Sequence, residues 1–215
     1  MLFPSLFLIC LWTVYPISYN AWLSFHRLDV GHPDAPFVGL YQYASILKDE
    51  EVLMSFQRAV IYTASVTIIQ LLIALGLASI ANLKFRGRSA FRILIVLPWA
   101  IPVIVTANIW KFMMWRDGVI NFILMSLGIH PLKWLESPIP AMLGTIMVSI
   151  WRTLPFVFLC ILAGMQGIPE TLYESAKIDG ASILQRFRYI TLPSLKSVLA
   201  IVVILRVVFI FNWFE

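Results

Sequence analysis

The most polar long stretch of this chain is YESAKIDGASILQRFRYITLPSL, residues 173–195. Its charged side chains are those of Glu174, Lys177, Asp179, Arg186 and Arg188. The pair Asp179-Gly180 is a strong turn signal, because Asp bonds nearby backbone groups and Gly adopts positive φ at little cost. The pattern therefore predicts two short helices around a turn, the second beginning at the N-cap residue Ser182 and ending near Ile190, before Pro193 starts another helix. Such an elbow offers charged groups to a protein partner or rests on lipid headgroups, and both interpretations stay open.

Two arginines, Arg152 and Arg206, lie inside long apolar runs. An arginine at the centre of a membrane costs about 2.5–3.5 kcal/mol on insertion scales, so its side chain should face the interior of a helix bundle or water. Each arginine either bonds helix carbonyls or a neighbouring subunit, or lines a pathway and contacts solute hydroxyls or an anionic group. The sequence leaves both roles open.

Other polar and aromatic residues within the apolar runs are candidates for solute contact. Asn108 and Asn212 offer amide groups to solute hydroxyls. Trp110, Trp151 and Phe156 have rings that stack on sugar faces, although packing between helices is the commoner role of such side chains.

Composition limits the classes of protein to which the chain belongs. It is 60% hydrophobic and 13% charged over 215 residues, against about 45–50% apolar and about 25% charged in soluble domains, which indicates a polytopic membrane protein. The net charge of +5 is carried largely by two connecting segments and has no RNA-binding motif beside it, so we expect no nucleic-acid partner. The three histidines lack metal-ligand spacing, and no residues are predicted to be catalytic.

The elements that must position these residues are transmembrane helices, each needing about 20 apolar residues. We expect a single transmembrane domain, 1–215, with spans at about 2–25, 59–83, 93–114, 138–165 and 194–215 and a polar loop at 166–193. The chain stops inside the fifth apolar run, so we expect it to lack a last span. The segment 26–58 is either a docking surface for an outer partner or an ordinary solvated loop.

The distribution of basic residues predicts the orientation of the chain. Four lie in the short segment 84–92 (Lys84, Arg86, Arg88 and Arg92), and four more lie in 170–196. Because short cytoplasmic loops carry an excess of Lys and Arg, both segments are predicted to face the cytoplasm.

The polar stretch also carries a family resemblance. The stretch contains the pattern Glu174-Ser175-Ala176-x-x-Asp179-Gly180-Ala181, five further residues, then Phe187-x-x-Ile190-x-Leu192-Pro193. This pattern resembles the "EAA" coupling loop of permease subunits in binding-protein-dependent ABC importers. Ser175 stands where the family usually has Ala. Four further segments are similar to the carbohydrate-uptake (maltose/sn-glycerol-3-phosphate-like) branch of that family: FRGRSAFR, VLPWAIP, WRDGVINFIL and WRTLPFVFLCILAGMQGIPETLYESAKIDGA. The terminal LRVVFIFNWFE resembles a segment that in the family continues into a Gly-Gly-Pro turn and a last helix.

This resemblance implies a fold, a location and partners. The fold would be an all-α polytopic membrane protein of the type I, maltose-permease-like class, in the cell (inner) membrane. A second permease subunit would complete the pathway, two cytosolic ATPase subunits would bind ATP and Mg, and an extracytoplasmic solute-binding protein would deliver the cargo. The chain has no G-x-x-x-x-G-K-[ST] loop, so a separate subunit would hydrolyse ATP.

The resemblance also implies residue roles. Glu174 would make polar contacts in a groove of the ATPase, Asp179-Gly180 would form the turn, Ala181 would allow close approach, and Phe187 would anchor the second helix to the membrane domain. The cargo would be a di- or oligosaccharide, or alternatively an anionic relative such as glycerol phosphate or an acidic sugar. A secondary transporter would instead show inverted repeats, and none is visible in the sequence.

Overall fold

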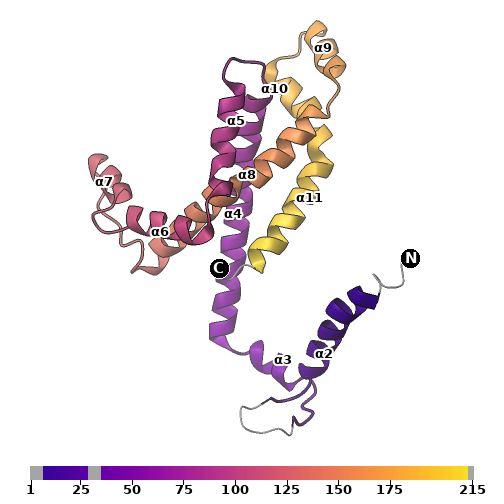
Figure 1. The fold of residues 1–215 in the computed structure, drawn as a ribbon, viewed down its shortest axis with the longest axis vertical. Coiled ribbons are helices and arrows are strands. Elements are labelled where there is room, and N and C mark those ends of the chain that lie inside the picture. The colour runs from indigo at the N-terminus through magenta and orange to yellow at the C-terminus, as the bar shows by residue number, and fades with distance from the viewer. Residues whose placement is uncertain (1–6, 29–34, 213–215) are drawn as a thin grey trace. The chain divides into compact units, whose positions relative to one another are not determined.

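The structure is a computed structural model that describes residues 7–28 and 35–212. The described residues are mainly helical, with one isolated antiparallel bridge between His26 and Phe37. The chain divides into two compact units, Met1–Arg58 and Ala59–Glu215, which are described separately (Figure 1).

The first unit contains an apolar helix, Phe7–Leu23, which is made of a π segment, η1 (Cys10–Val14), and α2 (Tyr15–Leu23). It overlaps the segment 2–25 that the sequence predicts as a span, of which residues 2–6 lie outside the described part. A short helix, α3 (Tyr41–Ile46), follows. The Tyr43 hydroxyl donates to Ser24 Oγ at 2.6 Å, which ties α3 to the end of the first helix.

Helix α4 (Glu50–Asn82) runs from the first unit into the second and includes nearly all of the predicted span 59–83. Its first turn is capped by Asp49, whose Oδ1 accepts from the Glu51 amide at 2.9 Å. Ala74, Ala78 and Ala81 are fully buried along one face, and their small side chains allow close packing against other helices.

The predicted span 93–114 is broken in the structure. Helix α5 (Arg88–Val96) leads through a 3₁₀ turn, η2 (Leu97–Ala100), into α6 (Val103–Met113), and the pair is bent by 99°. The break lies at Pro98 and Pro102: Ile101, which precedes Pro102, is extended with ψ of 128°, as the steric effect of a following proline favours. The segment is either one broken span or a re-entrant pair. A short helix, α7 (Val119–Ser126), follows it.

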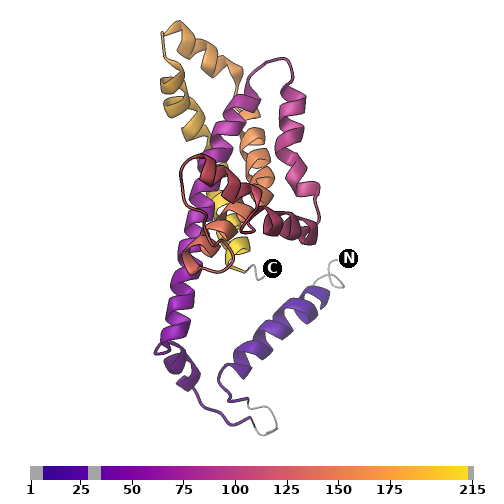
Figure 2. The same cartoon turned by 90° about the vertical axis from the view of Figure 1, so that its left-hand side faces the viewer.

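Helix α8 (Pro138–Gln166) is the centre of the second unit, where it contacts α5, η2 and α11 (Leu192–Phe211), as both ribbon views show (Figures 1 and 2). Its core contacts are apolar, with Val157, Phe158 and Ile161 fully buried. Gly164 lies where α8 meets α11: a Cβ added there would approach Leu195 Cδ2 to 2.8 Å. The helices therefore cross closely at this glycine.

Helices α10 (Ile183–Arg186) and α11 are joined by a π turn, η3 (Phe187–Thr191), into one continuous helix, Ile183–Phe211. The prediction that a short helix would end near Ile190 and that Pro193 would start a new one is therefore wrong. A proline ring inside a helix crowds the carbonyl four residues earlier, here that of Tyr189. That carbonyl lies within the wider π turn, which gives the ring room without ending the helix.

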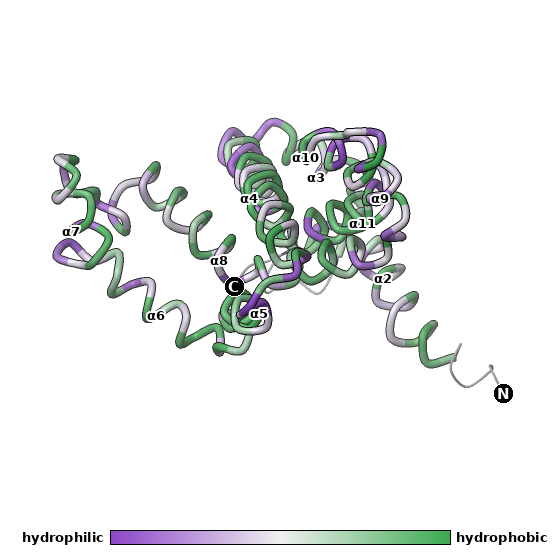
Figure 3. Tube along the Cα trace, turned by 90° about the horizontal axis from the view of Figure 1, so that it is seen from above, coloured by the Kyte–Doolittle hydropathy of each residue, from purple (hydrophilic) through white to green (hydrophobic). Residues whose placement is uncertain are grey.

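Three helices are long and apolar enough to cross a membrane: Glu50–Asn82, Pro138–Gln166 and Ile183–Phe211. The bent α5–α6 pair makes a fourth if it counts as one span, and Phe7–Leu23 is a shorter apolar helix within the described residues. Figure 3 shows α11 coloured mainly as hydrophobic, whereas α9 (Glu170–Ile178) includes hydrophilic segments. The predicted spans thus correspond to apolar helices, with residues 213–215 of the last one outside the described part.

Candidate functional site

The polar stretch folds as an elbow of two helices, α9 and α10, at the end of the second unit where α4 turns into α5 (Figures 1 and 2). Helix α9 ends at Ile178, Asp179 is its C-cap residue, and Gly180 has φ of +76°. The Gly180 amide donates to the Lys177 carbonyl at 3.1 Å and the Ala181 amide to the Ala176 carbonyl at 2.8 Å. These two bonds form a Schellman motif, which requires a left-handed residue at the glycine. The predicted turn at Asp179-Gly180 is confirmed.

The second limb of the elbow begins with a capping box. Ser182 Oγ accepts from the Gln185 amide at 3.3 Å, and the Ser182 amide donates to Gln185 Oε1 at 2.7 Å. The prediction of Ser182 as the N-cap is confirmed. The two bonds satisfy the backbone amides of Ser182 and Gln185 at the start of α10.

The tip of the elbow exposes apolar side chains. Ile178 is 88% exposed, Ile183 79% and Leu184 74%. The sequence predicts Ile183, Phe187 and Ile190 on one face, and the structure buries only the last two in part. Ile183 lies one turn before Phe187, nearer to the tip of the elbow. Apolar side chains at the end of a rigid loop with charged neighbours, including Glu174, are typical of a surface that contacts another protein.

Contacts at the base of the elbow link it to the helices behind it. The Tyr173 hydroxyl and Thr191 Oγ1, one from each limb, are 2.8 Å apart, and Thr191 is buried. Lys84 Nζ, in the α4–α5 turn, lies 3.1 Å from Glu170 Oε1. Both ends of that ion pair are exposed, so it adds at most about 1 kcal/mol. The elbow continues through Leu192 and Pro193 directly into α11.

The two mid-span arginines have different surroundings. Arg206 is 4% exposed and donates through Nε to Gln70 Oε1 at 3.0 Å and through Nη2 to Thr153 Oγ1 at 2.7 Å. Gln70 Nε2 also donates to Thr153 Oγ1 at 2.8 Å. This polar cluster, Gln70–Thr153–Arg206, joins α4, α8 and α11 through side chains alone. Arg152, the neighbour of Thr153, is half-buried.

The aromatic candidates come together where the broken span meets α8. The rings of Trp110 and Trp151 are 5.8 Å apart in an edge-to-face arrangement, and those of Trp99 and Phe156 are 6.3 Å apart in the same arrangement. Aromatic pairs at these distances contribute to packing beyond their buried area. The structure thus places Trp110, Trp151 and Phe156 at one junction between α6, η2 and α8.

Asn108 and Asn212 each bond their own helix. The Asn108 amide donates to the Ile104 carbonyl at 2.9 Å, and the Asn212 amide donates to the Val208 carbonyl at 2.8 Å. Both side chains are exposed in this chain. A contact with solute hydroxyls would use their amide oxygens or would replace these intrahelical bonds.

Asn121, at the start of α7, is a structural residue that the sequence analysis missed. It is fully buried, and its amide group donates to the carbonyls of Trp115, Arg116 and Leu132, while its Oδ1 accepts from the Leu132 amide and from Trp134 Nε1. These bonds hold the segment between α6 and α8 in one shape. The sequence offered one clue to this role: Asn121 closely follows the turn signal Asp117-Gly118, where an Asn side chain can bond nearby backbone groups. Among the described residues no three His, Cys, Asp or Glu side chains are close enough to share a metal ion.

Comparison with protein families decides the class of this chain. Residues 70–214 match the family described as the binding-protein-dependent transport system inner membrane component. The chain belongs to this family. The match covers the α5–α6 pair, the Gln70–Thr153–Arg206 cluster and the whole elbow.

Individual relatives and structures agree with that assignment. The chain is 38% identical to the trehalose/maltose transport system permease protein MalF of Thermococcus litoralis over 97% of this chain and 71% of that one. It is 34% identical to the sulfoquinovosyl glycerol transport system permease protein SmoG of Agrobacterium fabrum over 100% of this chain and 70% of that one. A crystal structure of a bacterial ABC transporter that imports the acidic polysaccharide alginate contains a similar chain, with TM-score 0.78, 24% identity and coverage of 99% and 72%.

Family membership confirms the class that the sequence predicted. The chain is a transport permease of the inner membrane rather than an enzyme, and ATP hydrolysis belongs to a separate subunit. The fold agrees with the predicted all-α permease fold, because the alginate transporter chain superposes on nearly all of this one.

Proposed function

We propose that this chain forms part of the pathway for a di- or oligosaccharide in an ATP-driven importer. The observation that carries the proposal is the family match over residues 70–214 together with relatives whose names specify sugars, including trehalose/maltose and sulfoquinovosyl glycerol. The second of these is anionic, and the structurally similar transporter imports an acidic polysaccharide. An anionic sugar or glycerol phosphate is therefore the second candidate cargo.

Within this proposal the elbow receives the movement of the ATPase. Its tip exposes Ile178, Ile183 and Leu184, which supply an apolar contact surface, and Glu174 supplies a charge beside it. The Schellman turn and the capping box keep the two limbs at a fixed angle. A push on the tip is carried through Tyr173 and Thr191 and along the continuous helix into α11.

The proposed assembly contains subunits beyond this chain. Two ATPase subunits bind ATP and Mg, a second permease subunit completes the pathway, and an extracytoplasmic binding protein delivers the sugar. The family name requires a binding protein, and a structure similar to this chain at 23% identity is a bacterial alginate transporter in complex with a pentasaccharide-bound periplasmic protein.

The pathway contacts are proposed from polar and aromatic residues of α6, α8 and the end of α11. Trp110, Trp151 and Phe156 offer ring surfaces to a sugar, Asn108 and Asn212 offer amide oxygens, and Arg152 offers a cation to an anionic group. Arg206 is assigned the structural role that the sequence left open, because it is buried and its Nε and Nη2 atoms donate within the Gln70–Thr153–Arg206 cluster.

Uptake by the assembled transporter in proteoliposomes tests the cargo class. The full-length subunit, with its partner permease, ATPase and binding protein, is given neutral maltose-type sugars and acidic sugars in parallel. The proposal expects ATP-dependent uptake of one sugar class, and a strong loss of uptake in Arg152→Gln only if that class is anionic. Uptake of neither class, with the complex assembled and its ATPase active, would contradict a sugar pathway.

A further inference from the structure

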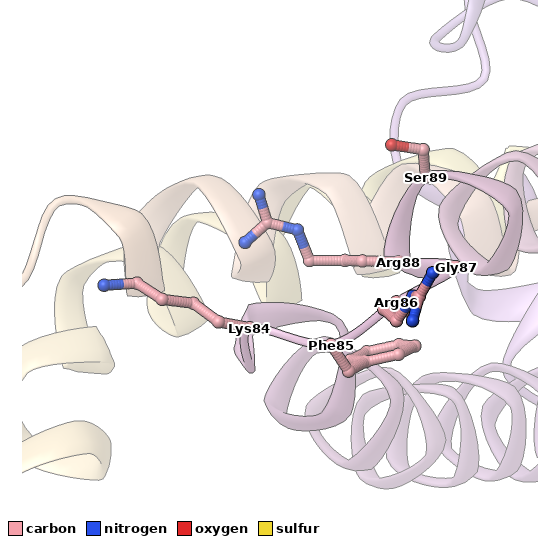
Figure 4. A pocket seen from close by; sticks show the side chains of 6 residues that line it. All are labelled: Lys84, Phe85, Arg86, Gly87, Arg88 and Ser89. Atoms are coloured by element: carbon pink, nitrogen blue, oxygen red, sulfur yellow. The ribbon is translucent and has the colours of Figure 1, made fainter.

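The α4–α5 turn is a concentrated basic surface on the second unit. One open pocket at this turn, shown in Figure 4, is lined by six residues: Lys84, Phe85, Arg86, Gly87, Arg88 and Ser89. Three of these six residues are cations. In Figure 4 the side chains of Lys84 and Arg88 extend in the same direction, away from the turn.

The turn is held in shape by its own contacts. The Phe85 and Phe91 rings pack edge to face with centroids 6.1 Å apart. Arg92 Nη2 donates to the Ala81 carbonyl at 2.8 Å, which ties α5 back to the last turn of α4. Gly87 has φ of +92°, a conformation that glycine adopts without strain. The cations on the turn are therefore presented by a fixed backbone.

The four cations of the segment 84–92 differ in their partners. Lys84 pairs with Glu170, and Arg92 is used within the turn. In the described part of the chain neither Arg86 nor Arg88 has an ion pair. Arg86 is exposed and Arg88 is half-buried, so both can reach a ligand from outside the chain.

The apolar flanks of the turn set its depth in the membrane. Leu83, just before it, is 63% exposed, and Ile93, just after it, is 64% exposed. Large exposed apolar side chains on a spanning protein face lipid tails, so the cations between them lie at the level of the headgroups. The positive-inside rule places this end at the cytoplasmic leaflet, which carries the anionic lipids.

We propose that Arg86 and Arg88 bind the phosphate of an anionic phospholipid headgroup, such as phosphatidylglycerol, at the cytoplasmic leaflet. The Arg86 and Arg88 side chains point to different sides of the turn in Figure 4, and each guanidinium offers paired N–H donors to phosphate oxygens, since arginine bonds phosphate in a bidentate manner. Bound lipid would hold the α4–α5 turn, and Lys84 would pass this constraint to the elbow through Glu170. The proposal does not depend on which solute is carried.

Native mass spectrometry of the assembled transporter tests the lipid site. The complex, stripped of lipid in detergent, is titrated with phosphatidylglycerol and with phosphatidylcholine. We expect tighter binding of phosphatidylglycerol, weakened about 25-fold in Arg86→Gln/Arg88→Gln, from the loss of two surface cations. Arg86→Lys/Arg88→Lys should retain most of the binding, which separates loss of charge from misfolding.

The matched control is Arg116→Gln/Lys133→Gln, which removes two exposed cations from the connection between the predicted spans 93–114 and 138–165, on the opposite side of the predicted membrane. It should bind phosphatidylglycerol as the unmodified transporter does. Equal affinity for the two lipids, or equal loss in the two double variants, would overturn the proposal. Competition by inorganic phosphate at the same concentration would show a free-anion site instead of a lipid site. Binding seen only after removal of the ATPase would also overturn the proposal, because that subunit would then cover the surface in the assembled transporter.

Discussion

Replacing Thr153 with Val tests whether the Gln70–Thr153–Arg206 cluster holds three helices together. Val has nearly the volume and the β-branched shape of Thr, so the change replaces the hydroxyl group with a methyl group and leaves the rest of the side chain the same. That hydroxyl accepts from Arg206 Nη2 at 2.7 Å and from Gln70 Nε2 at 2.8 Å, and it lies 2.6 Å from the Ser149 carbonyl. Two buried donors, one of them charged, would lose their acceptor.

The magnitude follows from the cost of unsatisfied buried groups. Each lost partner costs about 1–3 kcal/mol in a protein interior, whereas hydrogen bonds between membrane helices average about 0.6 kcal/mol. We expect Thr153→Val to lower the free energy of unfolding by about 2–3 kcal/mol, since the Arg206 donor is charged and only 4% exposed. Equilibrium unfolding in mixed detergent micelles, followed by circular dichroism, measures this difference.

The control is Thr145→Val on the same helix. Thr145 Oγ1 donates only to the Ala141 carbonyl one turn earlier, at 2.8 Å, and its side chain is exposed. Its replacement should change the free energy of unfolding by less than about 0.5 kcal/mol. Equal losses in the two variants would refute the reasoning, because the helix would then be responding to the loss of any threonine hydroxyl.

Three further substitutions test other contacts. Gly164→Ala should lower the free energy of unfolding by about 1–3 kcal/mol, because the new methyl group meets Leu195. Gly76→Ala should be at least as stable as the original protein, because nothing outside its own helix backbone lies within 4 Å of the added Cβ. Asn121→Ala should open the α6–α8 connection to proteases, whereas Asn108→Ala, which loses one intrahelical bond, should leave the digestion pattern unchanged. Ser182→Ala removes the capping box and should speed amide hydrogen exchange in α10 by about fivefold, the equivalent of about 1 kcal/mol; an unchanged exchange rate would argue against the cap.

Local signals in the sequence predicted the elbow well. The Asp179-Gly180 turn and the Ser182 cap depend on a few adjacent residues, and both are confirmed. The continuity of the helix through Pro193 was not predictable in this way, because it depends on the π turn just before that proline. The elbow was visible from the sequence, but its rigid connection to α11 was not.

Contacts between distant residues could not be predicted. Arg206 was identified as a buried cation, but its partners Gln70 and Thr153 are 136 and 53 positions away and became visible only when the helices were packed. The 99° bend at Pro98 and Pro102 is likewise sharper than proline residues alone indicate. Proline marks where a helix is weakened, and packing against α8 sets the direction of the break.

The most direct test of coupling through the elbow is the ATP hydrolysis of the assembled transporter with and without sugar-loaded binding protein. The measurement compares the unmodified subunit with Glu174→Lys, at the elbow, and with Glu136→Lys, a charge reversal at an exposed residue of the α7–α8 connection. We predict that sugar-dependent stimulation is lost in Glu174→Lys and kept in Glu136→Lys, with both complexes assembled. Equal stimulation in all three proteins would contradict transmission of the ATPase movement through this elbow.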